Sequence, residues 1–182
     1  MQLTLQPAGP ADLAAVAHLM NAAYRGRGED AGWATETAYI AGDRTSEDLL
    51  RDDLAATPGA ALLLSRPGPD APLDGCVWLQ PLSLDLWYLG SLTVAPTLQN
   101  AGFGRALLAS AEAWAAARGA RTVRITVVNV RTALIAWYTR RGYIATGEIE
   151  PFPYGDNRFG TPLRDDLAFV VLEKHLNLPA LP

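Results

Sequence analysis

Residues 89–105 read LGSLTVAPTLQNAGFGR, and this order of apolar, proline and glycine residues predicts a strand, a turn and the start of a helix. The apolar run breaks at Pro96, and Gly102 and Gly104 directly precede an amphipathic segment. Glycine at such a junction permits a positive φ and lets a ligand approach the main chain closely. The unpaired N–H groups of a first helical turn, with the positive end of the helix dipole behind them, favour an anion. We therefore expect a phosphate-bearing ligand at about Gly102 to Arg105. A tight turn that needs glycine only for packing is the alternative.

Hydrophobic periodicity extends this unit in both directions. Strands are expected at residues 3–5, 60–65, 75–82, 84–95, 122–128, 143–149 and 167–172, and helices at 10–24, 45–54, 104–118 and 131–141. Gly119 and Gly142 stand where the last two helices should end. The order is strand, two helices, three strands, helix, strand, helix and two strands. It predicts an α+β domain, a mixed sheet with helices on its faces.

The chain has 182 residues, a length typical of one domain, and we expect a single domain over 1–182. The Pro- and Gly-rich stretch at 66–74 is expected to be a hairpin loop, because apolar runs flank it. Residues 25–44 and 151–165 are predicted loops, and the first is long enough to suggest a function.

Composition excludes several classes of function. The net charge of −4 argues against a nucleic-acid partner. Cys76 is the only cysteine and is expected in the core, and His18 and His175 match no zinc spacing, so we expect no metal. There is no basic segment followed by an apolar run at the N-terminus and no apolar stretch of membrane-spanning length, which predicts a cytoplasmic protein without a membrane partner.

Two other phosphate-binding motifs fit the glycines poorly. A dinucleotide fingerprint would need a third glycine where Leu107 stands, and an acidic residue at the end of the next strand. A Walker loop would need Gly-Lys-Ser/Thr, which does not follow.

The same residues resemble the GNAT family, the GCN5-related N-acetyltransferases, whose signature Gln/Arg-x-x-Gly-x-Gly/Ala reads here Gln99-Asn100-Ala101-Gly102-Phe103-Gly104. Leu92-Thr93-Val94 upstream and Trp137-Tyr138-x-x-x-Gly142-Tyr143 downstream strengthen the resemblance. It implies an acyl-CoA N-acyltransferase fold with a mostly antiparallel central sheet, whose central strand carries a bulge and splays from its neighbour. It also implies acetyl-CoA as cofactor, with the pantetheine arm paired to the backbone of Leu92 and Val94.

The resemblance assigns further roles to single residues. The pyrophosphate should be held by main-chain N–H groups of a segment formed by Asn100, Ala101, Gly102, Phe103, Gly104 and Arg105, with Leu92, Thr93, Val94 and Gln99 completing the cofactor site. Tyr138 is the expected general acid for the leaving thiolate. Where many members carry an asparagine contacting the cofactor, this chain has Arg131, and Asn129 is the substitute we expect. The alternatives are that Arg131 itself reaches a phosphate or is a solvated residue of the first helical turn.

The acceptor pocket is expected between the two long loops, with Trp33, Glu36 and Tyr39 on one side and Phe152, Tyr154 and Arg158 on the other. Aromatic residues near carboxylates suit a cationic or aromatic amine, and Arg158 would instead suit an acidic acceptor. Candidates for the general base are Glu36, Asp43, Asp85, Asp165 and Asp166.

The leading hypothesis is an N-acetyltransferase acting on a primary amine of a small molecule. A protein N-terminal or lysine acetyltransferase and a non-catalytic acyl-CoA-binding or sensing module are the alternatives. A homodimer through exposed strands is a further expectation.

Overall fold

The computed structural model describes residues 3–26, 32–69 and 71–176. The strands are β1 (Gln6–Pro7), β2 (Ile40–Ala41), β3 (Ala61–Ser65), β4 (Gly75–Pro81), β5 (Leu86–Val94), β6 (Thr122–Val128), β7 (Ile144–Pro151), β8 (Thr161–Pro162) and β9 (Ala168–His175). The α-helices are α1 (Leu13–Arg25), α2 (Glu47–Ala56), α3 (Phe103–Ala116) and α4 (Thr132–Thr139). Short 3₁₀ turns lie at Pro10–Asp12, Pro96–Leu98 and Asn157–Phe159.

Seven strands form one sheet in the order β1-β3-β4-β5-β6-β9-β7, and β2 pairs with β8 in a second, two-stranded sheet. All neighbours in the large sheet are antiparallel except β5 and β6, which are parallel. The expected α+β class, with a mixed and mostly antiparallel sheet flanked by helices, is therefore confirmed.

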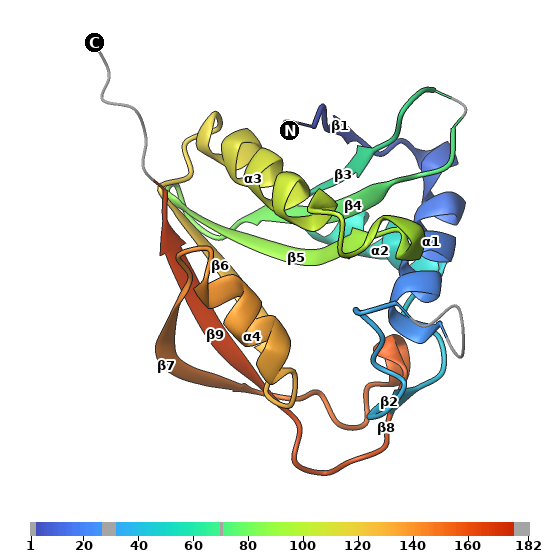
Figure 1. Cartoon of the computed structure of the whole chain (residues 1–182), viewed down its shortest axis with the longest axis vertical. Helices are drawn as coiled ribbons and strands as arrows, with labels where there is room; N and C mark the ends of the chain where they lie inside the picture. Colours follow the sequence, from blue (N-terminus) through green and yellow to red (C-terminus); the bar gives the residue numbers. More distant parts are fainter. Residues whose placement is uncertain (1–2, 27–31, 70, 177–182) are drawn as a thin grey trace.

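Alternation along β3 shows how the helices cover the sheet. Leu63 packs in the core beneath α3, whereas Leu62 and Leu64 pack on the opposite face against α1 and α2. All three are almost fully buried, and burying a leucine side chain contributes about 1.5–3 kcal/mol. Figure 1 shows α3 in front of the sheet and α2 behind it. The sheet is thus the middle of three layers.

The strands β5 and β6 pair over only three residues and then diverge. Their register is Leu86↔Thr122, Trp87↔Val123 and Tyr88↔Arg124, although both strands continue well beyond these pairs. In Figure 1 the two strands share the left end of the sheet and open into a V toward the right. The expected splaying of the central strand is confirmed.

Several helix ends follow the expected signals. Ser46 caps α2, its Oγ accepting a hydrogen bond from Leu49 N at 3.2 Å. Gly119 follows α3 with φ of 101°, and Gly142 follows α4 with φ of 88°. Glycine adopts these left-handed conformations without the steric cost that a Cβ brings.

The structure also differs from the expected elements. The first strand lies at Gln6–Pro7, after residues 3–5, because its partners on β3 are Leu64 and Leu63. The two predicted loops contain β2 and β8, which pair Ile40 with Pro162. Two-residue strands are too short to show alternation, so only the long-range pairing reveals them. Within the described residues, no helix combines the length and apolar character that crossing a membrane requires.

Candidate active site

One extra residue interrupts the ladder between β5 and β4. Trp78 is paired with Gly90 and Cys76 with Thr93, so two residues of β5 face one of β4. Ser91 lies in this bulge with φ of 47°, an uncommon value for a residue with a side chain. The expected bulge is confirmed, and it frees main-chain groups of β5 from the sheet.

A cavity of about 820 Å³ begins at the bulge and occupies the opening between β5 and β6. This volume is typical of a site for a cofactor or a drug-sized ligand. The strands contribute Tyr88, Leu89, Gly90, Ser91, Leu92, Val94, Ile125, Thr126, Val127 and Val128 to its walls. The turn before α3 and the first turn of α3 contribute Gln99, Asn100, Gly102, Gly104 and Arg105. The helix α4 and the residues directly after it contribute Leu134, Trp137, Tyr138, Arg140 and Arg141.

The turn before α3 has the backbone that its glycines predicted. Gly102 is the N-cap residue of α3 and is left-handed, with φ of 81°, and Asn100 also has a positive φ of 63°. The first main-chain N–H groups of α3 therefore begin at the wall of the cavity without a helical partner. Gln99 extends its side chain back to β5, where Nε2 donates to Val94 O at 3.0 Å.

Gly104 leaves room that the rest of the protein does not use. A Cβ at this position would lie 3.6 Å from Val94 Cγ2 and 3.7 Å from Trp137 Cζ2, which are ordinary contacts. Its φ is not in the left-handed region, so neither packing nor backbone geometry requires glycine here. Because the position lines the cavity, the missing side chain leaves space for a ligand.

Not every expected cofactor residue reaches this cavity. Thr93 is fully buried and its Oγ1 donates to Ser91 O, and Phe103 packs in the core. Ala101 is exposed outside the cavity. Asn129 is the clearest difference, because its side chain donates to Asp166 O and accepts from Ala168 N. The amide of Asn129 thus holds a loop instead of lining the site.

Three arginines gather beside the start of α3, and no motif of the sequence indicates two of them. Arg140 and Arg141 follow α4 and line the cavity together with Arg105. Burial lowers the pKa of Arg141, and repulsion from Arg140 and Arg105 lowers it further. Within the described residues, none of the three forms an ion pair with a carboxylate. Such an uncompensated group of cations attracts phosphates.

Tyr138 lies on α4, is 6% exposed and lines the cavity. Its ring packs edge-on against Trp137 and Tyr143, at centroid distances of 5.0 and 5.4 Å. Burial raises the pKa of Tyr138 well above its ordinary value, so the phenol keeps its proton at neutral pH. Among the described residues, its hydroxyl has no hydrogen-bond partner. The structure thus brings a protonated and unengaged phenol to the cavity.

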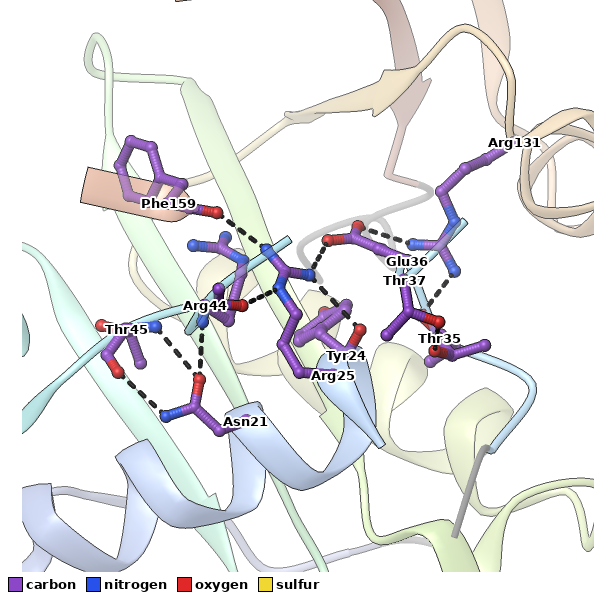
Figure 2. Close-up of polar contacts among 12 residues, drawn as sticks. Asn21, Tyr24, Arg25, Thr35, Glu36, Thr37, Arg44, Thr45, Arg131 and Phe159 are labelled. Carbon is purple, nitrogen blue, oxygen red and sulfur yellow. Dashed lines mark hydrogen bonds and ion pairs between the residues drawn. The ribbon is translucent and has the colours of Figure 1, made fainter. Parts of the chain in front are cut away.

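At the other end of the cavity, a buried ion-pair cluster joins three segments (Figure 2). Glu36 Oε2 lies 2.7 Å from Arg25 Nη1, and Glu36 Oε1 lies 3.3 Å from Arg131 Nη1. Arg25 also donates to the carbonyl oxygens of Gly42, Tyr24 and Phe159. Arg131 also donates to Ala34 O, so it links α4 to the loop before β2 at this end of the cavity. Glu36, an expected base, is engaged on both carboxylate oxygens.

The expected acceptor residues divide into two groups. Trp33, Glu36 and Phe152 line the cavity. Tyr39 is buried outside it, and the Tyr154 hydroxyl accepts a hydrogen bond from Leu167 N. Arg158, the expected partner of an acidic acceptor, forms an ion pair with Asp53 and is not among the lining residues.

The expected bases Asp43, Asp85, Asp165 and Asp166 are also outside the cavity. Besides Glu36, its lining carboxylates are Glu150 and Asp156, and Asp156 accepts from Arg158 N. Glu150 has no hydrogen-bond or ion-pair partner within the described part of the chain, so it is available to accept a proton. The described residues contain no group of three His, Cys, Asp or Glu side chains that could hold a metal ion.

Known proteins share this architecture. A solved GNAT family acetyltransferase from Elizabethkingia anophelis, with acetyl-CoA bound, is 19% identical, with a TM-score of 0.58 over 96% of this chain and 99% of its own. The yncA protein of Salmonella typhimurium, solved with its cofactor acetyl-CoA, is 20% identical, with a TM-score of 0.65 over 100% and 98%. The ribosomal-protein-S18-alanine N-acetyltransferase of Escherichia coli is 20% identical, with a TM-score of 0.63 over 97% and 96%.

These likenesses show the fold, and the sequence comparison shows the family. No curated protein matches the chain significantly in sequence. The family model described as the acetyltransferase (GNAT) family matches residues 32–143, which include the bulge, the turn before α3 and Tyr138. The chain therefore belongs to the GNAT family of acetyltransferases.

Proposed function

We propose that this protein is an N-acetyltransferase that transfers the acetyl group of acetyl-CoA to a primary amine of a small molecule. The observation that carries the proposal is the junction of the bulged β5 with the glycine-capped start of α3, both at the wall of one cavity. The structures from Elizabethkingia anophelis and Salmonella typhimurium share this fold and contain acetyl-CoA, which supports this choice of ligand.

The charges along the cavity favour one orientation of the cofactor. Its pyrophosphate would meet the main-chain N–H groups after Gly102, with Arg105, Arg140 and Arg141 nearby. The pantetheine arm would then follow the backbone of Leu92 and Val94 toward the bulge. The carbonyl oxygens of these residues already accept hydrogen bonds from Tyr24 Oη and Gln99 Nε2, both at 3.0 Å, so the arm would share them. This orientation brings the thioester to the end of the cavity that Tyr138 and the second half of β5 share.

The reaction we propose is direct attack. The amine nitrogen forms a bond to the acetyl carbonyl carbon, and a main-chain N–H near Val94 stabilises the tetrahedral oxyanion. The C–S bond then breaks as the sulfur takes the proton of the Tyr138 hydroxyl. Glu150, directly or through water, accepts the proton that the amine loses. Solvent returns a proton to Tyr138, so the products are the amide and the free thiol of coenzyme A.

The linked loops at the acceptor end favour a small molecule over a peptide. The loops that carry Trp33 and Phe159 are joined by the β2–β8 pairing and by the hydrogen bond from Arg25 Nη2 to Phe159 O, at 2.7 Å. A peptide acceptor would need an open groove where these loops meet.

Coenzyme A release in the presence of a panel of primary amines tests the proposal. Tyr138→Phe should lower kcat by about 10- to 10⁴-fold, the range that a general acid supplies, with acetyl-CoA affinity retained. Glu150→Gln should lower kcat with acetyl-CoA affinity retained, because it removes the group that accepts the proton of the amine. Tyr154→Phe, which removes a phenol outside the cavity, is the matched control and should keep the wild-type kcat. An unchanged kcat of Tyr138→Phe at every pH would exclude Tyr138 from the mechanism, and failure to bind acetyl-CoA would refute the function.

A further inference from the structure

Arg44 presents a charged group to the acceptor end of the cavity. Its guanidinium carbon lies 5.0 Å from the ring centroid of Phe159 and 5.6 Å from that of Tyr24. Its Nη2 lies 3.5 Å from Ser91 Oγ, so the side chain reaches the bulge of β5. Figure 2 shows the guanidinium of Arg44 beside the ring of Phe159. The cation therefore stands where β5 is released from β4, and it lines the cavity.

A clamp from α1 holds the main chain that carries this arginine. Asn21 Oδ1 accepts hydrogen bonds from Arg44 N at 2.6 Å and Thr45 N at 3.2 Å. Asn21 Nδ2 donates to Thr45 O at 2.9 Å. One amide side chain thus makes three bonds to two consecutive residues. The main chain of Arg44 is therefore held in place before any ligand binds, which lowers the entropic cost of using this residue for recognition.

The charge of Arg44 is not balanced within the protein. Glu36 lies between Arg25 and Arg131 and neutralises part of their charge. No carboxylate among the described residues lies within 4.0 Å of Arg44. Its aromatic neighbours exclude water from part of the guanidinium, and its single side-chain hydrogen bond is long. A planar guanidinium with free N–H groups matches a carboxylate in charge and geometry.

The cofactor we propose does not explain this arginine. Its phosphates would lie at the start of α3, where Arg105, Arg140 and Arg141 already supply positive charge. Arg44 instead contacts Ser91, beside the part of β5 where the thioester would lie. An anion bound to Arg44 would therefore belong to the acceptor.

We propose that the acceptor is an amine that also carries a carboxylate, an amino-acid-like molecule whose anionic group binds Arg44. The inference rests on the proposed function, because it assigns the acceptor of that reaction. An acceptor with a carboxylate differs from the cationic or aromatic amine that the sequence suggested. Arg44 would bind the acidic group that Arg158 was expected to bind. The amine is left to face the thioester while the carboxylate is held at the guanidinium.

Matched pairs of acceptors test the inference. The kcat/KM for amino acids is compared with that for the corresponding amino acid amides, which keep the amine and lose the negative charge. In the wild-type protein, the kcat/KM for an amino acid that is turned over should exceed the kcat/KM for its amide by about 10- to 150-fold. This is the effect of one charge-assisted hydrogen bond. Arg44→Gln should bring this ratio close to one without changing acetyl-CoA affinity. Arg44→Lys should keep an intermediate ratio, because a point charge remains.

Arg51→Gln is the matched control, since it removes the same charge from an exposed ion pair on α2 and should leave the ratio unchanged. A binding measurement covers acceptors that turn over slowly: N-acetyl amino acids should stabilise the coenzyme A complex against heat more than their amides do, and only when Arg44 is present. Equal handling of acids and amides, or an unchanged preference in Arg44→Gln, would overturn the inference. Loss of acetyl-CoA affinity in Arg44→Gln would also overturn it by assigning Arg44 to the cofactor. If the wild-type protein bound no acetyl-CoA, the proposed function itself would fail.

Discussion

Replacing Gly104 by alanine should separate the role of this position in folding from its role in binding. The added Cβ would meet Val94 Cγ2 at 3.6 Å and Trp137 Cζ2 at 3.7 Å, so the protein has room for it. Gly104 lies in the first turn of α3, where alanine is the better helix former. The free energy of unfolding of the ligand-free protein should stay the same or rise, by at most about 1 kcal/mol.

The same methyl group would occupy space that the cofactor requires. Overpacking by one methyl group costs about 1–3 kcal/mol, which corresponds to about 5- to 150-fold weaker binding. Isothermal titration with coenzyme A gives the affinity, and urea unfolding gives the stability. Gly102→Ala is the comparison, since its φ of 81° should make alanine cost about 1–2 kcal/mol of stability. Unchanged coenzyme A affinity in a stable Gly104→Ala protein would refute the placement of the cofactor against α3.

Two further predictions concern the buried polar groups. Glu36→Gln should lower the free energy of unfolding by about 3–5 kcal/mol, because it leaves two mostly buried arginines without their carboxylate. The control Glu47→Gln, in an exposed ion pair, should lower it by at most about 1 kcal/mol. Equal losses of the two variants in urea unfolding would contradict this reasoning. Burial raises the pKa of Tyr24, Tyr39, Tyr138 and Tyr143, and raises that of Cys76 to about 12. Above pH about 10 the unfolded chain loses phenolic protons that the folded protein keeps, so stability should fall by up to about 1.4 kcal/mol per pH unit for each tyrosine. Urea midpoints that stay constant from pH 8 to 11 would contradict the burial of these phenols.

The parts of the site that sequence alone predicted are those with local causes. Pro96, Gly102 and Gly104 determine a strand end, a left-handed cap and an open helix start, and each effect acts within a few residues. The bulge at Ser91 was expected only through the family resemblance, because no residue type in LGSLTV requires it. The bulge is visible only in the register between β5 and β4, which depends on the pairing of two separate strands.

The missed residues depend on long-range contacts. Arg44 lies in a stretch without periodicity, and its main chain is held by Asn21, which precedes it by more than 20 residues. Arg140 and Arg141 look like ordinary cations at a helix C-terminus, where the dipole favours them. Asn129 and Tyr154 stand at the expected places in the chain, yet nearby main-chain groups bind their polar atoms. Sequence position could not distinguish a side chain that faces the cavity from one that secures a loop.

The bulge in β5 has a consequence for how the strand could change. Before it, odd-numbered residues such as Trp87 and Leu89 point into the core beneath α3, and after it the even-numbered Val94 does so. The polar Thr93 is paired with Cys76, whose side chain packs on the other face of the sheet. Deleting Ser91 would place Leu92 opposite Val77 and restore strict alternation, so Thr93 and Val94 would keep the faces that they have now. Point substitutions leave the extra residue in place, whereas this one deletion would close the bulge and keep the core-facing residues on both sides of it.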